Sequence, residues 1–173
     1  NYYAVVALCD SLLGELLDDF DKHDMWKDTA LVVTTDHGFL LGEHDFWAKV
    51  SLRDESAMVP LIIRVPGKKP AVCRSLVELI DLYPTVAGLC GLEVPGRLQG
   101  RDISPLFDDP NRQMREAAFS VAPSSKGFLL RQDKWACIQY GEDAAMGIEL
   151  FDMINDPRQF TNLAGKPEFA AMV

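Results

Sequence analysis

Hydrophobic residues recur at helical spacing over the first 23 residues of the chain. The apolar positions, three or four residues apart, are Val5, Leu8, Leu12, Leu13, Leu16, Leu17 and Phe20. This spacing predicts an amphipathic helix that ends near Lys22 and His23. A chain seldom begins inside such a helix, with neither an initiator methionine nor a signal peptide before it, so we expect a fragment of a longer protein.

Two short apolar runs and a second helical pattern follow. The runs, residues 30–34 and the segment MVPLIIRVPG, predict buried strands because they are apolar throughout. VELIDLYPTVAGLCGLEVPG then has helical spacing that ends at Gly91, and a helix there tolerates Pro84 only near its start. The order helix, strand, loop, strand, helix predicts an α/β fold with a covered, mostly parallel sheet.

The pattern changes after Pro105. Three strand-like runs, EAAFSVAP, GFLLRQDKWACIQY and IELFDM, follow one another without helical segments between them. Gln132 and Asp133 lie where a hairpin turn is expected, and the sequence Asn-Asp-Pro at residues 155–157 predicts another turn. We therefore assign residues 1–110 to the α/β part and residues 111–173 to a small antiparallel α+β subdomain.

The composition indicates which classes of protein this chain can belong to. The 173 residues are 48% hydrophobic and 25% charged, which is typical of a globular domain. A net charge of −9 disfavours a nucleic-acid partner, and no apolar run approaches the roughly 20 residues of a membrane span. The cysteines, at positions 9, 73, 90 and 137, form no C-x-x-C pair. We interpret them as small buried residues rather than as zinc ligands or a redox-active pair. The sequence does not decide whether any of them form a disulfide, so they do not identify the compartment.

Titratable residues gather after the first apolar run, in the segment LVVTTDHGFLLGEHDFWAK. Asp36 and His37 follow that run directly, at the strand end where open α/β sheets bind ligands. A carboxylate oxygen and a neutral imidazole nitrogen on adjacent residues can reach one cation, and Gly38 permits close backbone approach. The alternative is that Asp36 caps the next turn and His37 is a buried, hydrogen-bonded histidine. For an isolated Asp-His pair this alternative is favoured about three to one.

Lys49 stands among apolar neighbours rather than in a run of charges. Its ammonium could hold an anionic group such as a sulfate or phosphate oxygen, or its stem could simply cover Trp47. Glu43 and His44 could orient a substrate or donate a proton, or they could hydrogen-bond within the loop. None of these residues decides the function when taken singly.

Taken together, these residues match a family. TTDHGFLLGEHDFWAKVSLRDESAMVPLIIRVPG resembles the sulfatases of the alkaline-phosphatase superfamily, and it looks nearest to the iduronate-sulfatase-like branch. The resemblance extends upstream through YYAVVALCDSLLGELLDDF and downstream through LVELIDLYPTVAGLCGLEVPGRLQGRDISPLF and ELFDMINDPRQFTNLA, in colinear order. It implies part of an alkaline-phosphatase-like sandwich with a mostly parallel sheet.

The resemblance also implies roles for individual residues. Asp36 and His37 match two ligands of the family's divalent cation, usually calcium, with magnesium as the other candidate; many relatives have Asn or Gln at the position of His37. Lys49 matches the lysine that contacts the sulfate ester and steadies charge on the leaving oxygen. His44 is a weaker candidate for a substrate contact.

The chain lacks the rest of the family's catalytic apparatus. Sulfatases use a formylglycine nucleophile made from Cys or Ser in a Cys/Ser-x-Pro-x-Arg motif, and no such motif is present here. The aspartate pair that precedes it in the family is missing too. We therefore expect the C-terminal fragment of a sulfuric ester hydrolase, inactive alone, whose partners are the N-terminal part of the same protein and a sulfate ester such as a sulfated sugar.

Two other functions stay open. One is a phosphonate or phosphate monoester hydrolase of the same superfamily, and the other is a non-catalytic binding module that keeps the fold. For the compartment, the family resemblance alone suggests the periplasm, the extracellular space or the lysosome.

Overall fold

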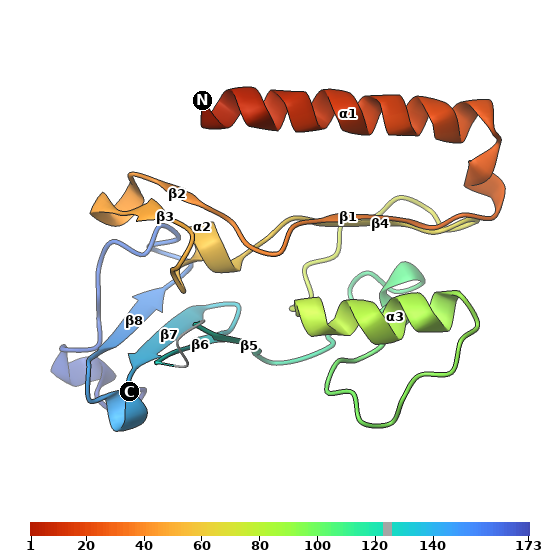
Figure 1. Ribbon diagram of the computed structural model, residues 1–173. Helices are drawn as coiled ribbons and strands as arrows, with labels where there is room; N and C mark the ends of the chain where they lie inside the picture. Colours follow the sequence, from red (N-terminus) through yellow and green to blue (C-terminus); the bar gives the residue numbers. More distant parts are fainter. Residues whose placement is uncertain (123–125) are drawn as a thin grey trace. The chain divides into compact units, whose positions relative to one another are not determined.

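The structure is a computed structural model that describes residues 1–122 and 126–173, and its elements follow the predicted order (Figure 1). Pro123, at the end of the run EAAFSVAP, lies outside the described residues. The chain forms two compact units, one of Asn1–Val33 with Ile62–Pro70 and one of Thr34–Leu61 with Ala71–Val173. The domain boundary near residue 110 stays a prediction.

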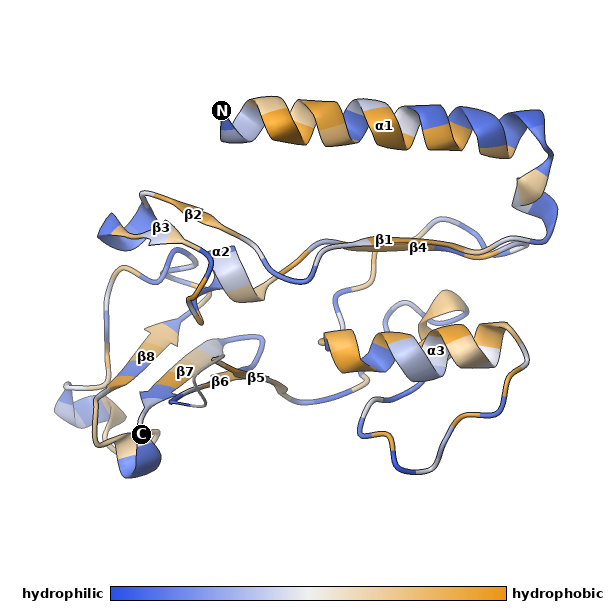
Figure 2. Cartoon of the chain, in the orientation of Figure 1, coloured by the Kyte–Doolittle hydropathy of each residue, from blue (hydrophilic) through white to orange (hydrophobic). Residues whose placement is uncertain are grey.

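The first unit is built around helix α1, Tyr2–Lys22, which confirms the predicted amphipathic helix. Hydrophobic positions recur along it in Figure 2. Its end is held by aromatic packing: the Phe20 ring lies 4.9 Å from the ring of Trp26, which belongs to the short 3-10 helix η1, Met25–Lys27. The indole N–H of Trp26 donates to Asp21, and the Arg64 guanidinium lies 4.8 Å from the centre of the Trp26 ring. None of the helices within the described ranges could cross a membrane.

The two apolar runs form strands β1, Leu31–Thr34, and β4, Leu61–Arg64, which pair in a two-stranded sheet. The ribbon passes through them in opposite directions (Figure 1). In the second unit, β2, Leu40–Leu41, pairs antiparallel with β3, Trp47–Ala48. The prediction of a mostly parallel sheet is therefore wrong for the strands that the structure describes. An apolar run indicates that a strand is to be covered, but it does not determine the direction of its neighbour.

Helix α3, Leu82–Leu89, also forms as predicted, and it follows the 3-10 helix η3, Leu79–Asp81. Pro84 falls in the first turn of α3, where a missing N–H costs nothing, and Gly91 follows the helix with a φ of 67°. Asp81 is fully buried, and its carboxylate accepts hydrogen bonds from Arg115 at 2.6 Å. This pair anchors the start of α3. A further 3-10 turn, η4, spans Ser104–Phe107.

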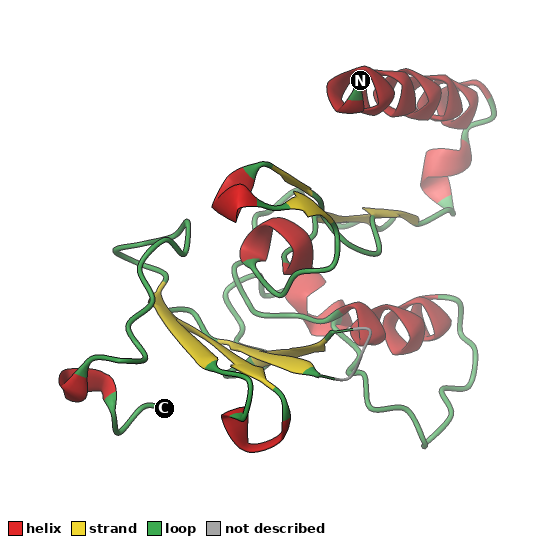
Figure 3. Ribbon diagram, turned by 60° about the vertical axis from the view of Figure 1, so that its left-hand side comes forward, coloured by secondary structure: helices red, strands yellow, loops and turns green. Residues whose placement is uncertain are grey.

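The C-terminal part contains a four-stranded antiparallel sheet, drawn in yellow in Figure 3. Its strands run in sequence order: β5, Ala118–Val121; β6, Gly127–Arg131; β7, Trp135–Tyr140; and β8, Ile148–Asp152. The predicted hairpin is confirmed, because Gln132 N–H donates to the Trp135 carbonyl at 2.7 Å. Two short 3-10 turns, η5 (Glu142–Ala144) and η6 (Pro167–Phe169), complete this region.

One face of this sheet carries the main core. Alternate residues of a strand point to one face, and here they form a cluster of Leu129, Ala136, Ile138, Phe151 and Met153. Leu52 joins the cluster, and Ala57 packs against it from helix α2, Asp54–Ala57. The segment that carries Lys49 and α2 is thus seated on the C-terminal sheet.

The cysteines correct another expectation. Cys9, Cys73 and Cys90 are exposed and Cys137 is half-buried, and all four are free thiols. Burial raises the pKa of the Cys137 thiol. Cysteine is usually buried because it behaves as a small apolar residue, but the exposed three lie on α1, in an irregular segment and at the end of α3.

Candidate functional site

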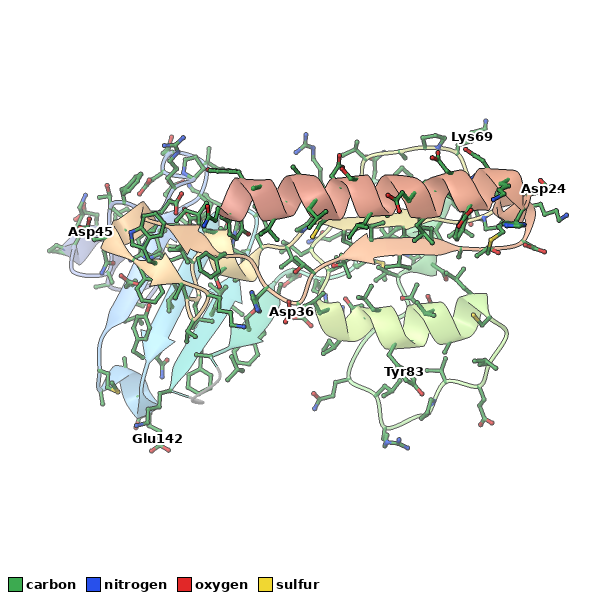
Figure 4. All side chains as sticks on the ribbon, turned by 45° about the horizontal axis from the view of Figure 1, so that its top comes forward. Asp24, Asp36, Asp45, Lys69, Tyr83 and Glu142 are labelled. Carbon is green, nitrogen blue, oxygen red and sulfur yellow. The ribbon has the colours of Figure 1, made fainter. Side chains whose placement is uncertain are left out.

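Asp36 and His37 lie on the loop that follows β1, where Figure 4 labels Asp36. The Asp36 side chain is 83% exposed, and its Oδ2 atom lies 3.4 Å from His37 Nε2. His37 Nδ1 lies 2.8 Å from the carbonyl oxygen of Gly38. A carbonyl can only accept, so Nδ1 carries a proton in this contact and Nε2 is the ring nitrogen that faces Asp36.

This pair fits two ligands of a divalent cation. Two ligand atoms that lie about 2.3–2.6 Å from a cation and at right angles to each other are about 3.3–3.7 Å apart, close to the separation of this oxygen and this nitrogen. Fixing the tautomer through the second nitrogen is also how metal-binding histidines are oriented. No group of three or more His, Cys, Asp or Glu side chains suited to a metal occurs within residues 1–122 and 126–173. Calcium takes 6–8 oxygens, so other ligands would come from outside this set.

The alternative roles for this pair are poorly supported. Within the described part of the chain, the Asp36 carboxylate accepts no backbone N–H, and its other contact is the Thr35 hydroxyl at 3.4 Å. It therefore does not cap a turn. The His37 side chain is 34% exposed, which is more than a buried structural histidine would show.

His44 lies in a tight turn, the 3-10 segment η2, Glu43–Asp45, in which His44 and Asp45 both have a φ of 57°. The turn directs the imidazole inward: His44 Nε2 lies 3.4 Å from Glu55 Oε1, and its ring centre lies 5.1 Å from that of Phe160. The Glu43 carboxylate accepts hydrogen bonds from the backbone N–H groups of Glu43 itself and of Leu41, and these bonds lower the pKa of the Glu43 carboxyl. The Glu43 carboxylate thus bonds within its own loop, whereas the His44 ring faces Glu55 of α2.

Lys49 directly follows β3 and is exposed. Across the residues that the structure describes, its ammonium makes no hydrogen bond or ion pair. Its carbonyl oxygen accepts from the Ser56 hydroxyl and, at 3.0 Å, from Ser51 N–H. Trp47 is 70% exposed, and its ring lies against Gly42. The cation of Lys49 is therefore available to an anion, while its backbone is fixed by the protein.

A pocket adjoins this loop. Its polar lining is His44, Ser51, Arg53 and Tyr140, and its apolar lining is Leu40, Phe46, Val50, Leu52 and Ala122. The structure thus places Asp36 beside His37 and His44 on the pocket wall. Within the described residues, Lys49 forms no hydrogen bond or ion pair with Asp36, His37 or His44. Three further residues lie around the candidate site, namely Arg53, Glu55 and Ser56. The sequence analysis did not identify them, and the only sequence signal for them is that they lie close to Lys49 in the chain.

The chain also resembles known proteins. Residues 42–173 match the family described as N-sulphoglucosamine sulphohydrolase, C-terminal, a stretch that includes His44 and Lys49 and begins after His37. Arylsulfatase K from Homo sapiens is 30% identical over 177 residues, which cover 95% of this chain and 33% of that protein. The chain thus spans about a third of the length of such relatives.

Solved structures agree on the fold. One, in complex with its substrate D-glucosamine-2-N,6-O-disulfate, is 31% identical with a TM-score of 0.78 and covers 94% of this chain and 35% of that one. A phosphonate monoester hydrolase from Silicibacter pomeroyi is 30% identical with a TM-score of 0.82 and covers 94% of this chain and 36% of that one. These matches do not single out the iduronate-sulfatase-like branch. The chain belongs to the N-sulphoglucosamine sulphohydrolase C-terminal family and corresponds to the C-terminal region of sulfatases of the alkaline-phosphatase superfamily.

Proposed function

We propose that the parent protein hydrolyses sulfate esters and that this chain supplies two metal ligands and a sulfate contact. The observation that carries the proposal is the adjacency of Asp36 Oδ2 and His37 Nε2, 3.4 Å apart, with the histidine tautomer fixed by the Gly38 carbonyl. A divalent cation bound there, calcium or magnesium, would neutralise charge on the sulfate group.

The residues of this chain then have distinct tasks. Asp36 and His37 would orient the sulfate through the cation. Lys49, exposed and without a carboxylate partner in the described structure, would pair with the ester oxygen as negative charge develops on it. His44, on the pocket wall, would contact the remainder of the substrate. The formylglycine that sulfatases use as nucleophile has no motif in this chain, so the chain alone is expected to be inactive.

The substrate class and the wider fold are part of the same proposal. A sulfated sugar is favoured because a similar structure was solved with D-glucosamine-2-N,6-O-disulfate as its substrate. We also propose that β1 and β4, which run in opposite directions here (Figure 1), belong to a larger sheet whose other strands are mostly parallel, with the small subdomain beginning near residue 111. The 62% exposure of Ile62 on β4 supports this, because a two-stranded sheet alone leaves such a residue uncovered.

A phosphonate or phosphate monoester hydrolase is the second candidate, favoured by the 0.82 TM-score with the Silicibacter pomeroyi enzyme. The test is the full-length protein assayed with p-nitrophenyl sulfate and p-nitrophenyl phenylphosphonate, with and without calcium. We expect a higher kcat/KM on the sulfate, lost in Asp36→Ala. Preference for the phosphonate would favour the second candidate, and no turnover of either would favour a non-catalytic module. Full activity in Asp36→Ala would overturn the metal assignment.

A further inference from the structure

Helix α2 is a single turn of four residues, yet it contacts three parts of the candidate site. Glu55 Oε1 faces His44 Nε2, and the Ser56 hydroxyl donates to the Lys49 carbonyl. The Ser56 carbonyl accepts from Gly38 N–H at 2.8 Å, next to His37. A displacement of α2 would therefore move the loops that carry the two metal ligands, His44 and Lys49.

So short a helix cannot hold itself in place, because one turn is below the length at which helices are stable in water. Its apolar contacts, Leu52 before it and Ala57 at its end, seat it on the C-terminal sheet. Apolar contact is non-directional and does not fix the rotation of the turn. Directional bonds must do so.

One of those bonds is the ion pair of the Asp54 carboxylate with Arg131 of β6 at 3.3 Å. The bonds to the backbone of Asp54 and to the Arg53 side chain include two from a loop more than 100 residues further along the chain. Asp54 N–H donates to Gln159 Oε1 at 2.7 Å, and Arg53 Nη1 donates to the Gln159 carbonyl at 2.6 Å. Arg53 Nη2 also pairs with Glu149 of β8 at 2.7 Å. Gln159 is 1% exposed and has a φ of 56°, so its side chain is committed to α2. We call these contacts of Gln159 with Arg53 and Asp54 the latch.

Ser56 connects the latch to Lys49. The Lys49 ammonium has no partner of its own within the described residues, so the protein can direct it only through the backbone. The bond from the Ser56 hydroxyl to the Lys49 carbonyl is one of two that hold that backbone, and Ser56 is 3% exposed. A shift of about 1 Å in a group that meets the transition state can cost about a hundredfold in rate.

We infer that Ser56 and Gln159 are positioning residues of the sulfatase site: Gln159 fixes α2 through the latch, and Ser56 passes that placement to Lys49. The inference rests on the proposed function, because it requires that Lys49 steadies charge on the leaving oxygen. It extends the site to the C-terminal loop, residues that touch neither metal nor substrate.

The test is the dependence of kcat/KM on the pKa of the leaving phenol, measured with a series of aryl sulfates on the full-length protein. A poorly placed Lys49 penalises poor leaving groups most, so the dependence should steepen. For Ser56→Ala and Gln159→Leu we expect kcat/KM to fall about tenfold or more on the poorest leaving group and about twofold on the best. A purely structural defect would lower all substrates equally, because it only reduces the folded fraction.

Matched variants separate the possible causes. Ser75→Ala removes a half-buried hydroxyl that also bonds the backbone, accepting from Met114 N–H at 2.8 Å, but lies far from the candidate site in the sequence, and it should leave the dependence unchanged. In the double variant Lys49→Ala with Ser56→Ala, the second change should have no further effect.

Each outcome of these measurements supports or overturns a named part of the inference. A parent-like dependence in both Ser56→Ala and Gln159→Leu, while Lys49→Ala steepens it, overturns the inference alone. A parent-like dependence in Lys49→Ala overturns the role of Lys49 in the proposed function instead. Loss of the fold in both positioning variants would assign Ser56 and Gln159 to stability and would also overturn the inference.

Discussion

Replacing Gly38 with alanine would place a methyl group where α2 leaves no room. A Cβ atom built on Gly38 lies 2.0 Å from the Glu55 carbonyl oxygen, 2.9 Å from its carbon and 3.3 Å from the Ser56 Cα. All three are backbone atoms, so no side chain can rotate away. Normal contact between such atoms begins near 3.5 Å, so the two segments must separate by more than about 1 Å.

The cost follows from the contacts that would be lost. Separation breaks the hydrogen bond from Gly38 N–H to the Ser56 carbonyl, a net loss of about 1 kcal/mol, and overpacking adds about 1–3 kcal/mol. We expect Gly38→Ala to lower the free energy of unfolding by about 2–4 kcal/mol. Because Gly38 directly follows His37, calcium affinity should fall as well.

Gly100→Ala is the matched control. Its Cβ would lie 2.0 Å from the Ile80 carbonyl oxygen, an equal clash beside Asp81 rather than beside His37. Urea denaturation and calcium titration of the full-length variants measure both effects. Both variants should lose stability, and only Gly38→Ala should lose calcium affinity. A Gly38→Ala protein with parent-like stability would refute the steric argument, and equal calcium affinities would refute the placement of the metal.

Three further predictions concern other residues. Lys49→Ala should lower kcat on an aryl sulfate about a hundredfold with little change in KM or melting temperature, and Lys49→Arg should restore it only in part, because a planar fork does not replace a compact charge. Arg115→Met should cost about 3–5 kcal/mol by urea denaturation, since it leaves the buried Asp81 carboxylate unpaired. Burial, followed by the nearby Glu149 carboxylate, raises the pKa of Tyr140 to about 12 from a usual value near 10. The folded state therefore favours the neutral phenol. The stabilisation of the folded state that results is present below about pH 10 and should be lost as the pH rises towards 12. Absorbance titration of the phenol and thermal melts at a series of pH values measure the two effects.

Local sequence predicted local structure well. The helix over Tyr2–Lys22, the hairpin at Gln132 and the first-turn position of Pro84 all follow from spacing and backbone chemistry within a few residues. Adjacency in sequence also predicted that Asp36 and His37 would lie together.

Long-range contacts were beyond such reasoning. The bond from Asp54 N–H to Gln159 joins residues 105 positions apart, and no spacing rule links them. Nor could the apolar runs reveal the direction of β1 and β4, since direction depends on how the chain returns between them. The exposed Cys9 and Cys90 show the same limit, because burial is decided by what packs on a helix rather than by the residue itself.

The latch limits which recombinants between members of this family can be functional. Arg53 and Asp54 of the latch lie before the predicted boundary near residue 110, whereas Gln159 lies after it, as does Glu149, the ion-pair partner of Arg53. A chimera of two relatives joined at that boundary would inherit the two halves of the latch from different parents. Recombination there should therefore yield working proteins mainly when these four positions agree, so the C-terminal sheet should not be exchanged freely as a module.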